Sequence, residues 1–146
     1  YATWIAAMRD LVNAGCMNIC NEVANTKIGN PYSGEDPNYI ESPYSQRSFY
    51  DFEDNMESIW NCLNGGRSES RDTGKSLMAF VQENNPSMAS SINKVYEAAI
   101  AALKTCQALP GGFVNNTSAK EVGVAQAAIN DLNTELSKLD QWLGTL

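Results

Sequence analysis

The feature that most constrains this chain is an apolar seam near its C-terminal end. Its residues recur at alternating intervals of three and four, which places them on one face of an α-helix: Val122, Ala125, Ile129, Leu132, Leu136, Leu139 and Leu143. Ser118, followed three residues later by Glu121, has the pattern of a capping box that starts this helix. Such a seam must be buried, either against other helices of the same chain or against a second copy in a coiled coil.

Other amphipathic segments in the same chain favour the first alternative. The spacing predicts a first helix over residues 3–24, with a stripe formed by Trp4, Ile5, Met8, Leu11, Val12, Cys16, Ile19 and Val23. A second helix is predicted from Ser48, where Ser48 and Asp51 resemble a capping box, to the Gly65-Gly66 pair. A third starts at Asn85-Pro86, with Asn as N-cap and Pro at the first helical position, and stops at Pro110.

These helices predict an all-α fold, because no segment has the alternating pattern of a β-strand. We expect one domain over residues 1–146, built as an antiparallel four-helix bundle. A short extra helix is expected near residues 73–84. Residues 25–47 contain three prolines and no apolar periodicity, so they predict a long ordered loop between the first two main helices.

Composition excludes several classes of partner. The net charge is −7 and the pI is near 4.5, with no basic stripe, so nucleic acid and anionic lipid are not expected to bind. The longest apolar run, residues 98–103, is far too short for a transmembrane segment. The chain opens on "YATWIAAMRDL" without an initiator Met, which indicates a processed chain or a fragment of a longer one.

Four cysteines and the absence of histidine limit the chemistry. Cys16, Cys20 and Cys106 lie on or beside apolar stripes and are expected to be small buried hydrophobes, although a metal site built from all the cysteines is an alternative. Their redox state stays open. Without histidine, only Lys27 or a carboxylate is available as the base of a nucleophile, so hydrolysis by this chain alone is not expected.

An acidic region follows the first helix. Between Glu35 and Glu57 there are seven acidic residues and one base, Arg47. A hard cation favours such a field, but the spacing matches no EF-hand, and a solvated acidic face is the simpler interpretation. Serine, tyrosine and asparagine side chains in this region either organise a polar site or serve as caps and turn residues.

Two motifs in this region resemble a known family. "NEVANTKIGNPY" and "ESPYSQRSFYDFEDNMESIWN" are similar to the paired signatures of the imelysin-like family, EVxxxKIGxP and ESxYSxxSxxDFxxNIxSI. The later "AAIAALKTCQALPGGF" and "AAINDLNTELSKLDQWL" follow in the family's order. Met56 stands where the family usually has Ile, and Leu63 stands where it often has Tyr.

The resemblance implies a bacterial periplasmic or outer-membrane protein, anchored as a lipoprotein, made of two helical halves and associated with iron uptake. This chain resembles the C-terminal half only. The GxHxxE motif of the N-terminal half is absent, since the chain has no histidine. The expected partners are that N-terminal half or other cell-envelope iron-uptake components.

By the same resemblance, the chain supplies a polar, acidic wall to a ligand or metal site shared between the halves. The implied ligand-binding residues are Glu22, Lys27, Glu41, Ser42, Tyr44, Ser45, Ser48, Asp51, Asn55 and Ser58. Iron or another divalent cation is the implied cofactor of the complete protein, and no catalytic residue is assigned. The alternatives are one half of a metal-dependent peptidase and a plain helical interaction module.

Overall fold

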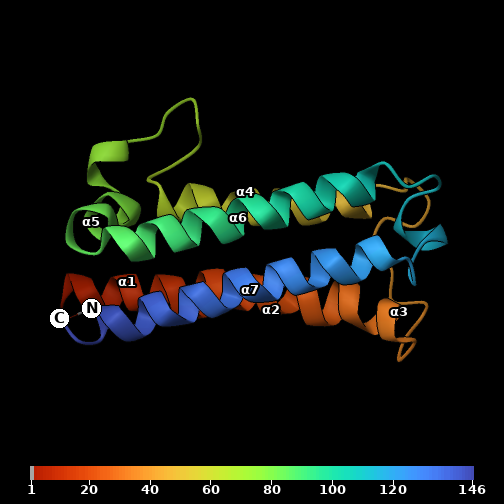
Figure 1. Ribbon diagram of the computed structural model, residues 1–146, viewed down its shortest axis with the longest axis horizontal. Helices are drawn as coiled ribbons and strands as arrows, with labels where there is room; N and C mark the ends of the chain where they lie inside the picture. The colour runs from red at the N-terminus through yellow and green to blue at the C-terminus, as the bar shows by residue number, and fades with distance from the viewer. Residues whose placement is uncertain (1) are drawn as a thin grey trace.

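The computed structural model describes residues 2–146, and all regular structure within that range is helical. Four long rods alternate in direction along the molecule (Figure 1). The first rod covers residues 4–33 and is followed by α4 (Ser48–Leu63), α6 (Pro86–Gln107) and α7 (Lys120–Leu143). A short helix, α5 (Leu77–Asn84), precedes α6. The prediction of an all-α fold with one extra short helix is confirmed.

The C-terminal seam is the centre of the core. Its members, from Val122 to Leu143, are all fully buried, and α7 packs against both α6 and the first rod. A seam that is covered within its own chain has no apolar face left for a coiled-coil partner. The intramolecular alternative is therefore correct.

The first rod is longer than the sequence predicts. It consists of α1 (Trp4–Asp10), a π-helical turn (Leu11–Met17), α2 (Asn18–Asn21), a second π-helical turn (Glu22–Ile28) and α3 (Gly29–Ser33). It ends where Gly34 takes a left-handed conformation with φ of 81°. The predicted end at residue 24 is wrong, and the loop before α4 covers residues 34–47 instead of 25–47.

The two π-helical turns explain why the stripe continues past residue 24. Val12, Cys16, Cys20, Ala24 and Ile28 are buried at strict four-residue intervals. Such a row would wind around an α-helix, which has about 3.6 residues per turn. The wider π-turns lengthen the repeat, so the row keeps facing the core.

Both predicted capping boxes are wrong, whereas the Asn-Pro start is confirmed. α4 begins after Arg47, and α7 begins after Ala119, and neither N-cap residue makes a side-chain cap. At α6, Asn85 accepts a hydrogen bond from the Met88 N–H at 3.3 Å.

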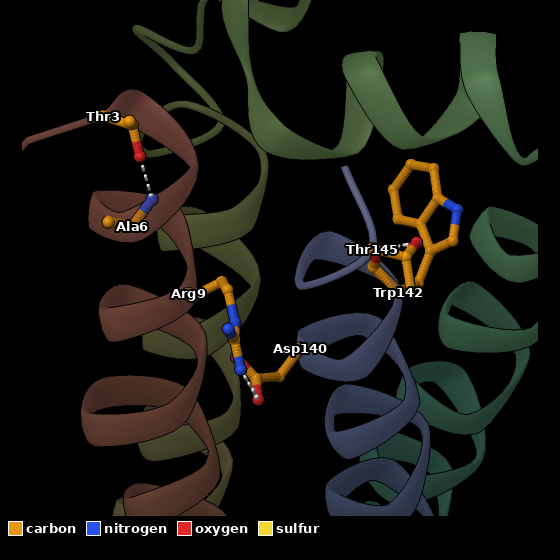
Figure 2. A network of polar contacts seen from close by, with 6 residues as sticks. All are labelled: Thr3, Ala6, Arg9, Asp140, Trp142 and Thr145. Atoms are coloured by element: carbon orange, nitrogen blue, oxygen red, sulfur yellow. Dashed lines mark hydrogen bonds and ion pairs between the residues drawn. The ribbon is translucent and has the colours of Figure 1, made fainter.

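The two ends of the bundle are held differently. At the end with both termini, the Arg9 guanidinium on α1 donates to both carboxylate oxygens of Asp140 on α7, at 2.9 and 3.1 Å (Figure 2). This carboxylate raises the pKa of Arg9 above its usual value, so the guanidinium stays charged. At the opposite end, the rings of Phe49, Phe52 and Phe113 pack together with centroids 5.3 to 6.3 Å apart. These rings fix the start of α4, which carries the candidate site.

Within residues 2–146, no helix combines the length and the apolar character needed to cross a bilayer.

Candidate functional site

A polar hollow of about 520 Å³ lies where the first rod, the loop 34–47 and α4 meet. We call it the signature hollow, and it is lined by Lys27, Glu41, Ser42, Asp51, Asp54 and Asn55. Lys27 comes from the second π-helical turn, Glu41 and Ser42 from the loop, and the remaining three from α4. Residues far apart in the sequence thus form one surface.

Lys27 is the only base of the signature hollow. Its ammonium lies 3.1 Å from the Glu41 carboxylate and 3.7 Å from that of Glu22. The Lys27 side chain is only 14% exposed, whereas the two acids are about half exposed. The lysine is thus fixed between two carboxylates, and the site keeps an excess of negative charge because Asp51 and Asp54 also line it.

Ser42 joins the loop to α4. Its hydroxyl donates to the Asp51 carboxylate at 2.6 Å. The backbone of Ser42 has a φ of 55°, in the left-handed region that non-glycine residues rarely adopt. Such strain persists only where surrounding contacts maintain it, and it concentrates at functional sites.

Two further contacts hold the loop 34–47 in place. The buried Ser48 hydroxyl, at the start of α4, donates to the backbone carbonyl of Glu41. Farther along, Gly112 approaches the loop so closely that an added Cβ would lie 2.8 Å from the carbonyl oxygen of Gln46. The turn after α6 therefore packs closely against the loop. Only glycine fits at this position, because Gly112 also has a φ of 64°.

The structure brings together six of the residues implied by the resemblance. Five of them line the signature hollow, and Glu22 joins them through Lys27. Tyr44 is fully exposed, and Ser45 donates to the Ser42 carbonyl at 3.4 Å within the loop. Ser48 is a loop anchor. Ser58 lies farther along α4, where it donates to the Asp54 carbonyl at 2.9 Å.

Asp54 belongs to the signature hollow although the resemblance did not assign it. A local signal existed, since Asp54 lies three residues after Asp51 and therefore shares its helix face. Within residues 2–146, neither Asp54 nor Asn55 has a side-chain partner. These two groups are free to contact a ligand.

A separate apolar groove of about 570 Å³ lies along the same pair of helices. We call it the seam groove. It lies between the first rod and α4, and its apolar lining includes Ala7, Met8, Leu11, Ala14, Ile19 and Ile59. The first rod and α4 pack against each other less extensively than α6 and α7 do.

The part of the chain that the structure describes contains no group of three or more Cys, Asp or Glu side chains placed to hold a metal ion. Lys27 lies between the carboxylates of Glu22 and Glu41. Among residues 2–146, the four cysteines are likewise not grouped as metal ligands, so their placement gives the alternative of a four-cysteine site no support.

Comparison with known proteins gives consistent results. The family model described as imelysin matches residues 3–139. Iron-regulated protein A of Synechococcus elongatus is 31% identical over 138 residues, which cover 90% of this chain and 37% of that protein. The crystal structure of an imelysin peptidase from Bacteroides ovatus superposes with a TM-score of 0.85 at 28% identity, over 97% of this chain and 41% of that one. A solved protein from Parabacteroides distasonis gives a TM-score of 0.81 at 29% identity, with coverages of 94% and 41%. The chain thus spans well under half the length of these relatives.

Proposed function

Because the chain belongs to the imelysin family, we propose that it forms the C-terminal helical half of a bacterial cell-envelope protein that takes part in iron uptake. In this role, the signature hollow is one wall of a ligand or metal site, and an N-terminal half supplies the other wall. The name of the Synechococcus relative supports a connection with iron.

The observation that carries this proposal is that some polar side chains of the signature hollow have protein partners, whereas others have none. Lys27, Ser42 and Asp51 already have protein partners, which hold three chain segments together. Asp54 and Asn55 have none within residues 2–146, and Asp54 is exposed. Carboxylate and amide oxygens are suitable ligands for hard cations, but two such residues are too few to complete a coordination sphere.

The seam groove supports the location of the second half. It lies between the first rod and α4, which also supply residues to the signature hollow, and its lining is mainly apolar. Apolar surface of this kind marks contact sites in proteins. The solved relatives are more than twice as long as this chain, so a further helical portion of such a protein is a suitable occupant. A single partner lying along the first rod and α4 would cover the groove and close the hollow.

The test is calorimetric titration of the chain with Fe²⁺ under anaerobic conditions and with Mn²⁺ in air. We expect weak binding by the chain alone, and at least about tenfold tighter binding when the N-terminal portion of an imelysin-family protein is added, because additional ligands then reach the cation. Asp54→Asn is expected to remove this gain. Glu83→Gln, an exposed acid on α5, is the matched control that should preserve it.

If the N-terminal portion forms no complex with the chain, or if Asp54→Asn and Glu83→Gln behave alike, the shared site does not exist. A complex that forms without any cation effect would favour the plain interaction module instead.

The name of the Bacteroides relative favours one second candidate, a metal-dependent peptidase half. Chelator-sensitive hydrolysis of casein by the two portions together, abolished by Asp54→Asn, would support it. The absence of hydrolysis alongside tight cation binding would leave the binding function.

A further inference from the structure

Two of the four thiols lie in the same groove, between the first rod and α4. Cys16 lies on the first π-helical turn and is 2% exposed, whereas Cys62 lies near the end of α4 and is exposed. Both line the seam groove, and Cys62 is among the groups that raise the pKa of Cys16.

The position of this pair is related to that of the signature hollow. The first rod and α4 run in opposite directions (Figure 1). The first rod and α4 supply Lys27 and Asp51 to the signature hollow, as they supply Cys16 and Cys62 to the seam groove. A covalent link at the cysteines would therefore join the two helices that carry the site.

We propose that Cys16 and Cys62 form an intramolecular disulfide when the chain meets a disulfide oxidant. This inference is independent of the proposed function. The other two cysteines are less suitable partners, because Cys20 lies one turn from Cys16 on the same rod, where a disulfide is geometrically awkward, and neither Cys20 nor Cys106 lines the seam groove.

The reaction proceeds by two thiol–disulfide exchanges. The exposed Cys62 loses its proton to solvent, and the resulting thiolate attacks one sulfur of the oxidant disulfide, which releases the first thiolate of the oxidant. Cys16 then loses its proton, attacks the Sγ of Cys62, and displaces the second. The chain gives up two electrons and two protons, and the oxidant is reduced to two thiols.

The two steps differ in rate. Burial, followed by the neighbouring thiols of Cys62 and Cys20, raises the pKa of Cys16 to about 12, so little of it is thiolate at neutral pH. Attack by Cys62 is therefore expected to be the fast step and closure by Cys16 the slow one. Closure should accelerate with rising pH.

The disulfide would link the first rod covalently to α4. It closes a loop of roughly 46 residues, for which the chain-entropy relation gives about a thousandfold shift of the unfolding equilibrium toward the folded state. For a domain of this size, that corresponds to a rise in melting temperature of about 10 °C.

The experiment compares the purified chain after reduction with the same chain after incubation with oxidised glutathione. Each sample is unfolded, labelled with N-ethylmaleimide and weighed by mass spectrometry. We expect four labels on the reduced chain and two on the oxidised chain, with Cys16 and Cys62 in one linked peptide. The oxidised chain should also melt about 10 °C higher.

Variants separate this pair from the alternatives. Cys62→Ala should keep every remaining thiol free, Cys16→Ala should retain one glutathione on Cys62, and neither should show a rise in melting temperature. Cys106→Ala is the matched control, and it should still lose two thiols. Four labels on the unsubstituted chain after oxidation, glutathione retained on its Cys62, a link between two chains, or a disulfide that leaves the melting temperature unchanged would each overturn the inference.

Discussion

Replacement of Lys27 by methionine tests whether the signature hollow faces a cation or an anion. Methionine keeps most of the apolar stem of the lysine and removes only the charge. The Lys27 ammonium lies 3.1 Å from Glu41 and 3.7 Å from Glu22, and Asp51 and Asp54 line the same hollow. The substitution therefore leaves these carboxylates without a compensating charge.

The magnitudes follow from distance and exposure. Two unit charges about 4 Å apart interact by about 1 kcal/mol in water, so a divalent cation near Lys27 is opposed by about 2 kcal/mol. Removal of the ammonium should then strengthen cation binding by about thirtyfold. Stability should change little, because ion pairs with half-exposed acids contribute only about 0.2 to 1 kcal/mol each.

The assay is calorimetric titration with Mn²⁺ at low ionic strength and again in about 0.15 M salt, where screening weakens the effect. Lys138→Met is the matched control, because Lys138 pairs with Glu135 at 2.6 Å on α7, away from the hollow. Its Mn²⁺ affinity should remain that of the original chain. Unchanged or weaker Mn²⁺ binding by Lys27→Met would refute the reasoning and indicate that the lysine contacts an anionic ligand.

Three further substitutions test the framework around the site. Gly112→Ala should lower the free energy of unfolding by about 1 to 3 kcal/mol, because φ is 64° and the added Cβ meets the loop backbone; urea unfolding measures this, and Gly15→Ala, with nothing within 4 Å, should not destabilise. Ser48→Ala leaves a loop carbonyl without its donor and should cost about 1 to 3 kcal/mol, whereas the exposed Ser58→Ala should stay within about 0.5 kcal/mol. Burial raises the pKa of Cys20 from 9.0 to about 12. The unfolded chain therefore loses this proton at a lower pH than the folded chain, and the free energy of unfolding falls as the pH rises from 9 to 12. Cys20→Ala should reduce this dependence of the free energy of unfolding on pH by about 1.4 kcal/mol per pH unit.

The parts of the fold that the sequence predicts well are those with a local, regular pattern. The seam of α7 and the Asn85-Pro86 start of α6 depend on neighbouring residues in the sequence, and both are found as expected. The end of the first rod was mispredicted because its four-residue stripe fits neither an α-helix nor a strand. The π-turns that accommodate it have contacts outside their own segment, such as the hydrogen bond from the Gln126 amide to the Ala24 carbonyl at 3.0 Å.

The capping boxes failed for a related reason. Ser48 has the right sequence context for a cap, but its hydroxyl donates to Glu41 in the preceding loop. The pattern of a serine followed three residues later by an acid cannot show whether a tertiary contact competes for the hydroxyl. The site is equally non-local, since Lys27 meets Glu41 only because the loop turns back over the first rod. Family resemblance, and not spacing, brought these residues together in the prediction.

The polar residues of the two motifs have two different tasks. Ser48 and the Ser42–Asp51 pair maintain the left-handed backbone at Ser42. Substitutions of Ser42 and Ser48 should therefore affect a ligand indirectly, by releasing the loop. Asp54 and Asn55 make no such contact within residues 2–146, so substitutions there should alter binding while stability remains. Comparing the two sets of substitutions therefore distinguishes a binding surface from a loop that is only well anchored. Only a binding surface predicts that substitutions of Asp54 and Asn55 alter binding while stability remains.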